Sequence, residues 1–492
     1  MYNTPKGGSF LSKNYEKLEK ELMRFRALQA ALTLFSFDSD TGAPENSFEN
    51  SMMLSGILSE EAFNILNSDY TKSLVHACLQ EPLSELELKI VQEVSKEHER
   101  LACFTKEEYS NYQMLLKKSQ MAWLKAKKDN DYESFAPYLK DVIAVQKEMA
   151  IKRQKDGQTL YDVLLGDYEE GMNEKEYDEF FALVKKKIVP LIQELPTSTR
   201  PEFLNQSYPI ETQKSFNEWL ASYIGFDLTK GKIAETEHPY TTSLHNHDVR
   251  FTNHYYENNV ESAIFSTIHE GGHGIYEQQV SDELTLTHIG HAISSGMHES
   301  QSRFMENCVG RSHAFWEGVY PKLKEVSLED WVKAINAPEC SLIRIEADEL
   351  SYPLHIMVRY ELEKEIINGD VSVEELPQRW NALYKDYLGI DVPNDRQGIL
   401  QDMHWAGGMF GYFPTYALGS AIAAQIYHYL KENKDIETLL KEGKLDVICA
   451  WLKENIHQYG GTKHTQEILM GSVNETFNPN YYVDYLIEKY RH

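Results

Sequence analysis

Residues 266–276 have the sequence STIHEGGHGIY, which contains the pattern H-E-x-x-H. Residues four apart project from the same face of an α-helix, so His269 and His273 can bind one metal ion. Glu270 then lies beside the open position of that metal, where it can accept a proton from water. The arrangement is typical of a zinc hydrolase, with Glu270 as the candidate catalytic base.

The sequence around the pattern predicts a helix. The run Asn258–Glu261 has the form of a helix start, in which an Asn cap is followed three residues later by Glu. An apolar stripe continues every fourth residue, at Val260, Ile264 and Ile268. Gly271, Gly272 and Gly274, in and directly after the pattern, each cost about 1 kcal/mol relative to Ala inside a helix. They predict that another backbone or a ligand approaches closely; the alternative is a helix whose histidines bind no metal.

The composition favours an all-α protein. The chain has 492 residues, of which 42% are hydrophobic, and no linker divides it. Glycine and proline are scarce, and helical periods cover residues 14–37, 59–66, 84–129, 132–153, 175–194 and most of the chain after 294. In residues 233–256 the alternation of Val249 and Phe251 instead predicts a strand or hairpin, whose edge could pair with an extended peptide. We expect a mainly helical fold with a small β-hairpin or sheet near the metal site.

Charge and cysteine content exclude several classes of partner. The chain has 76 acidic and 49 basic residues, a formal net charge of −27, and no basic stripe, so we expect no nucleic-acid partner. Five scattered cysteines without a C-x-x-C pair predict reduced thiols in a cytoplasmic protein. Residues 1–10 lack the apolar core of a secretory signal, and the most apolar segment, 416–430, is too short to span a membrane. We therefore expect no membrane partner.

A third metal ligand is needed, because a catalytic zinc usually has three protein ligands and a water. Glu299, at the start of another expected helix, is the best candidate. Glu277, one turn after His273, and Glu306, two turns after Glu299, are alternatives. Two imidazoles and one carboxylate suit one zinc ion per chain, and cobalt fits the same donor set.

Six short motifs resemble those of the carboxypeptidase Taq family of zinc metallocarboxypeptidases, and the resemblance covers essentially the whole chain. Besides H-E-x-x-H, they are D-x-R-x-T at 248–252, H-E-S-Q at 298–301, I-R-x-x-A-D at 343–348 and G-x-x-Q-D-x-H-W at 398–405. The sixth is a near match, His238-Pro239-Tyr240, where the family usually has Phe last. In this family the H-E-S-Q segment supplies the third metal ligand, which implies Glu299.

The resemblance implies an all-helical fold with a long, deep substrate groove and the metal at its floor, similar to the helical oligopeptidases of the neurolysin type. It implies one catalytic unit over residues 1–492, in which 1–230 form a mostly helical groove wall and 231–492 carry the metal site and the substrate-binding motifs. It also implies a cytosolic homodimer that removes single residues from peptide C-termini, with broad preference and poor action next to proline.

A carboxypeptidase must recognise the free carboxylate of its substrate, and a planar guanidinium is the best partner for it. We favour Arg344 over Arg250 for this role. The alternatives are structural ion pairs of Arg344 with Asp348 and of Arg250 with Asp248.

Peptide hydrolysis also needs donors for the developing oxyanion. The segment from His404 resembles the His…Gly-Gly…Tyr segment of related helical oligopeptidases, which implies His404 and Tyr416 as the donors and Tyr412 as the second choice. We expect His238 to line the groove and Asp402 to orient a histidine.

Two other functions fit part of these patterns. An endo-oligopeptidase or dipeptidyl carboxypeptidase with a similar helical groove would use the same metal chemistry and release larger products. A non-catalytic, acidic helical scaffold would contain the metal site without turnover.

Overall fold

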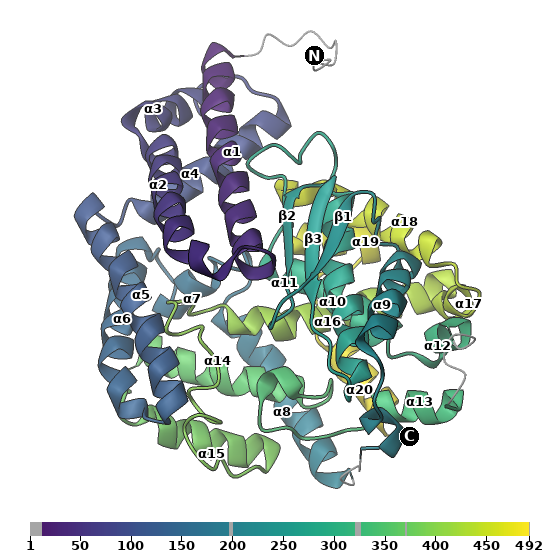
Figure 1. The fold of residues 1–492 in the computed structure, drawn as a ribbon. Coiled ribbons are helices and arrows are strands. Elements are labelled where there is room, and N and C mark those ends of the chain that lie inside the picture. Colours follow the sequence, from purple (N-terminus) through teal and green to yellow (C-terminus); the bar gives the residue numbers. More distant parts are fainter. Residues whose placement is uncertain (1–11, 196–199, 320–325, 370, 492) are drawn as a thin grey trace.

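The computed structural model describes residues 12–195, 200–319, 326–369 and 371–491, and it is mainly helical with one small sheet, as expected (Figure 1). The helices before the sheet are α1 (Lys13–Thr41), α2 (Phe48–Asn67), α3 (Asp69–Cys78), α4 (Glu85–Leu101), α5 (Lys106–Asp129), α6 (Tyr132–Arg153), α7 (Leu160–Leu165), α8 (Glu174–Glu194) and α9 (Ile210–Ile224). The helices after it are α10 (Val260–Gln279), α11 (Ser295–Arg303), α12 (His313–Val319), α13 (Leu328–Ile335), α14 (Tyr352–Asn368), α15 (Leu376–Leu388), α16 (Phe413–Lys434), α17 (Ile436–Lys441), α18 (Leu445–Asn455), α19 (Thr465–Val473) and α20 (Asn480–Tyr490).

Helix α2 is longer than the sequence pattern indicates. The apolar period predicts a helix over 59–66, whereas α2 begins at Phe48. Its first turns expose Met52, Met53 and Ile57 to solvent, so no buried stripe marks them. The apolar residues Ala62 and Leu66, which the period does detect, are buried.

The sheet has three strands, β1 (Gly231–Glu235), β2 (Thr241–His245) and β3 (Asp248–Asn253), in the order β1-β3-β2. β1 runs parallel to the central strand β3, and β2 runs antiparallel to it. Val249 and Phe251, whose alternation predicts a strand, are fully buried in β3. The sheet packs on α10, and β2 lies at its edge, with α1 close by (Figure 1).

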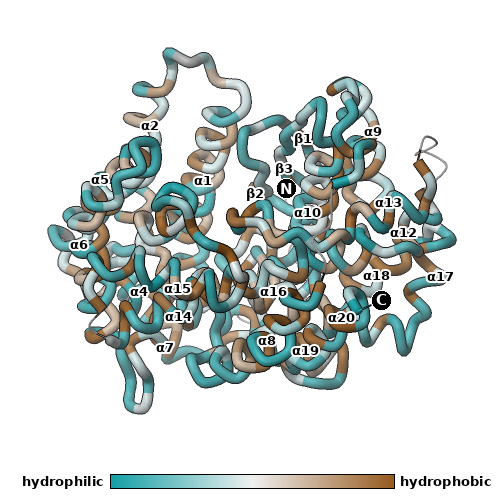
Figure 2. Tube along the Cα trace, turned by 90° about the horizontal axis from the view of Figure 1, so that it is seen from below, coloured by the Kyte–Doolittle hydropathy of each residue, from teal (hydrophilic) through white to brown (hydrophobic). Residues whose placement is uncertain are grey.

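Buried apolar side chains form two clusters. The main core extends from α5 to α20 and includes β3. A smaller N-terminal cluster joins helices α1 to α4 to the segment that follows α10; its members are Tyr15, Leu18, Leu22, Leu66, Leu74, Val75, Cys78, Ile90, Val91, Val94, Val280, Leu284 and Ile289. In Figure 2 hydrophobic segments concentrate toward the middle of the molecule, where α16 lies, and hydrophilic ones toward its outside. None of the described helices is long and apolar enough to cross a membrane.

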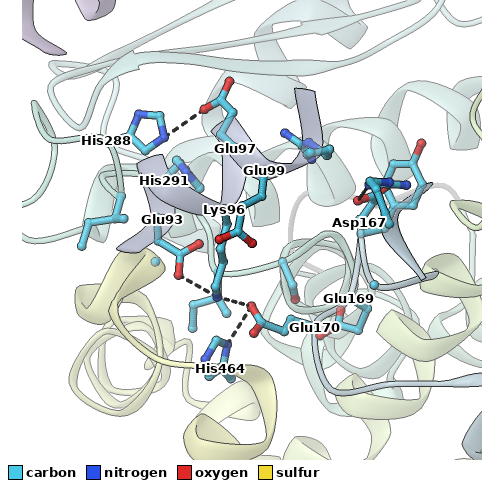
Figure 3. Close-up of a pocket in the computed structure, with 18 of the residues that line it drawn as sticks. Glu93, Lys96, Glu97, Glu99, Asp167, Glu169, Glu170, His288, His291 and His464 are labelled. Atoms are coloured by element: carbon cyan, nitrogen blue, oxygen red, sulfur yellow. Dashed lines mark hydrogen bonds and ion pairs between the residues drawn. The ribbon is translucent and has the colours of Figure 1, made fainter. Parts of the chain in front are cut away.

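A cavity of about 1160 Å³ is lined by residues of α1, α4, α6 and α7 and of the segments 166–170, 288–294 and 461–465 (Figure 3). Ion pairs connect its walls: Glu97 on α4 lies 3.1 Å from the imidazole of His288, and Lys96 lies 2.7 Å from Glu170. The candidate metal ligands do not line this cavity. Several of its charged side chains pair with one another, and the pairs of Glu97 with His288 and of Lys96 with Glu170 connect α4 to the rest of the molecule.

We expect Leu18→Ala to destabilise the protein by about 2–5 kcal/mol, because it removes a fully buried side chain from the N-terminal cluster. The measurement is urea-induced unfolding followed by circular dichroism. Met23→Ala on the same helix is the control; its side chain is exposed, so a change within about 0.5 kcal/mol is expected. Equal effects of the two substitutions would contradict the packing described here.

Candidate active site

Helix α10 carries the H-E-x-x-H pattern, and the structure confirms that this segment is helical. Its cap differs by one residue from the prediction: the side chain of Asn259, not that of Asn258, accepts the N–H of Ser262. The consequence for the site is small, because the residues of the pattern lie three turns further along the helix.

The glycines of α10 are sites of close approach. A Cβ on Gly272 would lie 2.8 Å from the carbonyl oxygen of Gln301 in α11, and one on Gly274 would lie 2.6 Å from the ring of Phe226. Neither position has room for a side chain. The close approach predicted from the glycines is therefore present, and at Gly272 the approaching element is the backbone of α11, the helix of Glu299.

His269, His273 and Glu299 form a group whose candidate ligand atoms all lie within 4.8 Å of one another. Oε2 of Glu299 lies 3.4 Å from Nε2 of His273 and 3.9 Å from Nε2 of His269. Burial, together with the nearby His298, lowers the pKa of His273 to about 3, so its ring is neutral at pH 7 and keeps a lone pair. Two imidazoles and a carboxylate at this separation fit a divalent cation.

The two alternative third ligands have other partners. Nδ1 of His269 donates to Oε2 of Glu306 at 2.9 Å, on the side of the ring away from Glu299. Glu277 lies 3.2 Å from Nε2 of His298, whose ring stacks on that of His273 at a centroid distance of 4.1 Å. Glu306 thus orients the imidazole of His269, Glu277 lies beside His298, and neither carboxylate belongs to the donor group.

Glu270 faces the edge strand of the sheet. The hydroxyl of Thr241, the first residue of β2, donates to Oε2 of Glu270 at 2.6 Å. Burial raises the pKa of Glu270 above its usual value, although His269 and the Thr241 hydroxyl oppose the shift. Thr241 bears no motif signal beyond its place directly after the near match His238–Tyr240, so sequence reasoning does not assign it this role.

Arg344 belongs to a buried network of two arginines and one carboxylate. Its Nη2 donates to Oδ1 of Asp402 at 2.9 Å, and Nε of Arg359 donates to Oδ2 of the same residue at 2.7 Å. The Nη1 of Arg344 donates to the hydroxyl of Tyr352 at 3.3 Å. Arg344 is 7% exposed and Arg359 is fully buried. Two guanidinium groups and one carboxylate leave one positive charge, which suits an anionic ligand.

This network corrects the expectation for Asp402 and argues against the alternative of an Arg344–Asp348 pair. Asp402 accepts hydrogen bonds from two arginines and does not orient a histidine, and the ionic partner of Arg344 is Asp402, not Asp348. Asp348 instead accepts backbone N–H groups just before α14. No motif marks Arg359; its only signal in the sequence is a charge within the otherwise apolar run LHIMVRY.

His404 and Tyr416 lie side by side, with 3.3 Å between Nε2 and the hydroxyl oxygen. Burial lowers the pKa of His404 to about 4 and holds the pKa of Tyr416 well above its usual value, so both groups are neutral at pH 7. The Arg344 guanidinium lies 5.1 Å from the centre of the Tyr416 ring. Tyr412 packs edge-on against Tyr416, with 5.1 Å between the two ring centres. The structure thus gathers four of the predicted site residues into one group.

Helix α16 connects this group to the candidate metal ligands. Tyr416 lies in its first turn, and Gly419 follows one turn later. A Cβ on Gly419 would lie 2.6 Å from Cγ of Glu299, so the backbone of α16 rests directly on that side chain. The oxyanion candidates are therefore held within about one helical turn of the candidate metal ligands.

Two predicted site residues lie elsewhere. Arg250, on β3, donates to both carboxylate oxygens of Asp248 at 2.7 and 2.8 Å and lies over the ring of Phe37. This is the structural pair that the sequence leaves as an alternative. His238 is exposed in the connection between β1 and β2. Among the described residues, neither side chain contacts the metal-ligand group.

Comparison with known proteins identifies the family. The model of the carboxypeptidase Taq (M32) metallopeptidases matches residues 17–490. The chain belongs to this family. It is 41% identical to carboxypeptidase 1 of Bacillus subtilis (strain 168), over 97% of this chain and 98% of that protein. It is 37% identical to thermostable carboxypeptidase 1 of Thermus thermophilus, over 84% of each chain.

Solved structures of M32 carboxypeptidases have the same fold. The Pyrococcus furiosus carboxypeptidase superimposes with a TM-score of 0.93 at 32% identity, over 98% of this chain and 100% of that one. The M32 carboxypeptidase of Deinococcus radiodurans R1 also has a TM-score of 0.93, at 29% identity, over 97% and 99% of the two chains. This M32 enzyme is a metal-dependent carboxypeptidase. The family implies a divalent metal, for which His269, His273 and Glu299 form a fitting group.

We expect Gly272→Ala to weaken metal binding by at least about tenfold, because its Cβ would force α10 away from α11 and separate the histidines from Glu299. Competition with a chromophoric chelator measures the dissociation constant. Gly471→Ala in α19 is the matched control, since its Cβ meets no atom within 4 Å. The control should bind metal as the wild type does; unchanged affinity in Gly272→Ala would show that the helix contact does not set the site.

Proposed function

We propose that this M32 enzyme releases single amino acids from the C-termini of peptides with broad preference for the terminal side chain and poor action next to proline. The observation that carries the proposal is the net positive charge of the network of Arg344, Arg359 and Asp402, in which Arg344 lies beside Tyr416. A site built to hold a terminal carboxylate limits cleavage to the last peptide bond. Zinc is the proposed native metal, and cobalt fits the same donors.

His269, His273 and Glu299 are the proposed ligands of that metal, which supplies Lewis-acid activation of water when bound. Glu270 accepts the proton of the attacking water and returns it to the leaving amine. Its raised pKa and its hydrogen bond from Thr241 support this role, because a base should be poised closer to neutral pH than an exposed glutamate is. The free edge of β2, which begins at Thr241, is the proposed pairing surface for the substrate backbone.

His404 and Tyr416 are the proposed donors to the oxyanion. Both are neutral at pH 7, so each retains a proton to donate, and both are half-buried beside each other. Tyr412 packs against both side chains and is proposed to hold them in place. Arg250 and His238 remain proposed groove residues; the pairing of Arg250 with Asp248 favours a structural role.

The cellular context and the assembly are part of the same proposal. The five cysteines are free in the structure, which supports a cytoplasmic protein. A homodimer, and a groove wall formed by residues 1–230, follow from the resemblance to the family. Light scattering on the purified protein tests the dimer.

Replacement of Glu270 by Gln should reduce kcat by about 10²–10⁴-fold, because the isosteric amide cannot accept the proton. Metal content should stay at one ion per chain, since Glu270 is outside the donor group. Metal analysis and release of the terminal residue from a blocked dipeptide measure the two quantities. A Glu270→Gln protein with wild-type turnover would remove this residue from the mechanism.

The test of the function compares a blocked dipeptide that has a free C-terminal carboxylate with its C-terminal amide, with and without chelator. Chelator-sensitive release from the free acid alone is expected. Arg344→Gln should lower kcat/KM for the acid by about 100-fold and abolish discrimination against the amide, since a buried charge-assisted contact is lost. Arg250→Gln, the matched control, should retain discrimination. Equal cleavage of both substrates by the wild type, or release of larger fragments from a longer peptide, would favour an endo-oligopeptidase or dipeptidyl carboxypeptidase.

A further inference from the structure

We propose that Arg303 is a positioning residue of the metal centre, which restricts Glu299 to donation through one oxygen and ties Glu299 to the carboxylate that orients His269. The inference rests on the proposed function, because it takes Glu299 as a metal ligand. None of the motifs points to Arg303. Its role follows from the contacts of one side chain.

The guanidinium of Arg303 bridges two carboxylates of the site. Its Nε donates to Oε1 of Glu299 at 2.7 Å, and its Nη1 donates to Oε2 of Glu306 at 3.2 Å. The same oxygen of Glu306 accepts from Nδ1 of His269 at 2.9 Å. These hydrogen bonds form a continuous chain. It begins at Nδ1 of His269, passes through Glu306 and Arg303, and ends at Oε1 of Glu299.

This arrangement divides the two oxygens of Glu299 between two tasks. Oε2 lies 3.4 Å from Nε2 of His273 and 3.9 Å from Nε2 of His269, so it belongs to the donor group. Oε1 is held by Arg303. If a metal is bound, a carboxylate that donates through one oxygen would leave more of its coordination sphere to water than one that donates through two. By holding Oε1, Arg303 would favour the one-oxygen mode.

The helix geometry explains why one arginine reaches both carboxylates. Glu299 and Arg303 are four residues apart on α11 and lie on one face. A π-helical turn, Phe304–Val309, follows directly. Such a turn contains an extra residue and changes the direction of the next side chains. Glu306, in this turn, is three residues after Arg303 and lies beside it.

Arg303 is also fixed from its other side. Its guanidinium lies 4.3 Å from the centre of the Tyr352 ring, and its side chain is 15% exposed. The planar group is thus stacked on an aromatic face while its edges bind the carboxylates. A lysine at this position would keep the charge but would lack the fork that reaches two carboxylates at once. Charge and geometry can therefore be separated by experiment.

The first test needs no variant. Infrared difference spectra of the metal-loaded and metal-free wild type report the separation of the antisymmetric and symmetric carboxylate stretches, which is larger for a one-oxygen ligand than for a two-oxygen ligand. A new band pair of the one-oxygen type, absent in Glu299→Gln, is expected. A two-oxygen pattern assigned to Glu299 in the wild type would overturn the inference.

The second test uses cobalt-loaded Arg303→Lys, whose visible absorption reports coordination number. We expect a folded protein with weaker absorption than the wild type, typical of a higher coordination number, and a kcat reduced at least about tenfold with little change in KM. Arg153→Lys is the matched control, because Arg153 binds both oxygens of Asp167 away from the metal centre; its spectrum should equal that of the wild type. A folded Arg303→Lys with the wild-type spectrum would contradict the proposal.

Glu299→Gln separates the two levels of argument. If this variant binds cobalt with wild-type affinity, Glu299 is not a ligand and the proposed donor group itself fails. If Glu299→Gln loses cobalt while Arg303→Lys keeps the wild-type spectrum and kcat, the donor group stands and only the role of Arg303 fails. If Arg303→Lys does not fold, the shorter, neutral variant Arg303→Gln is measured in the same way, and the infrared result on the wild type still decides.

Discussion

The contact between α10 and α11 is the constraint on which the active site depends. Two of the candidate metal ligands, His269 and His273, lie on one helix, but the third, Glu299, comes from another. Its carboxylate must therefore lie within a few ångströms of the two imidazoles. At Gly272 the backbones of the two helices meet with no room for a Cβ, and at Gly419 the backbone of α16 closes on Glu299 from the opposite side. Glycine lowers the intrinsic stability of a helix. Here it permits the approach that places Glu299 against His269 and His273.

Around this contact, Glu299, Glu306 and Asp402 all have arginine partners. Arg303 serves Glu299 and Glu306, and Arg344 and Arg359 share Asp402. Such pairs contribute little net stability once desolvation is counted, but breaking one leaves an uncompensated buried charge. Their value is geometric, because each fork of hydrogen bonds fixes the orientation of a carboxylate. The same forks that compensate the buried charges therefore hold the active site rigid.

Much of this site could be predicted from the sequence, and the limits have a physical origin. The histidine pair, Glu270 and the strand at Val249 and Phe251 depend on local periods of four and two, which a single chain displays directly. The assignment of Glu299 needed the family motif, since spacing alone left Glu277 and Glu306 open. The partners of Asp402 could not be predicted, because Arg344, Arg359 and Asp402 meet only through tertiary packing. The roles of Arg303 and Thr241 could not be predicted for the same reason. Nothing in the sequence around either residue indicates which glutamate its side chain contacts.

The surroundings of the proposed ligand Glu299 and the proposed base Glu270 shift their pKa values in opposite directions. Burial alone would raise the pKa of both Glu299 and Glu270. For Glu299, Arg303 and the two imidazoles overcome that effect and hold the pKa well below its usual range, so the carboxylate stays ionised and can bind a cation. Glu270 faces Thr241, a neutral donor, and its pKa stays raised. The pKa values of two buried glutamates on adjoining helices are thus shifted in opposite directions. This difference suits the proposed roles, because a metal ligand must stay deprotonated whereas a base must take up a proton.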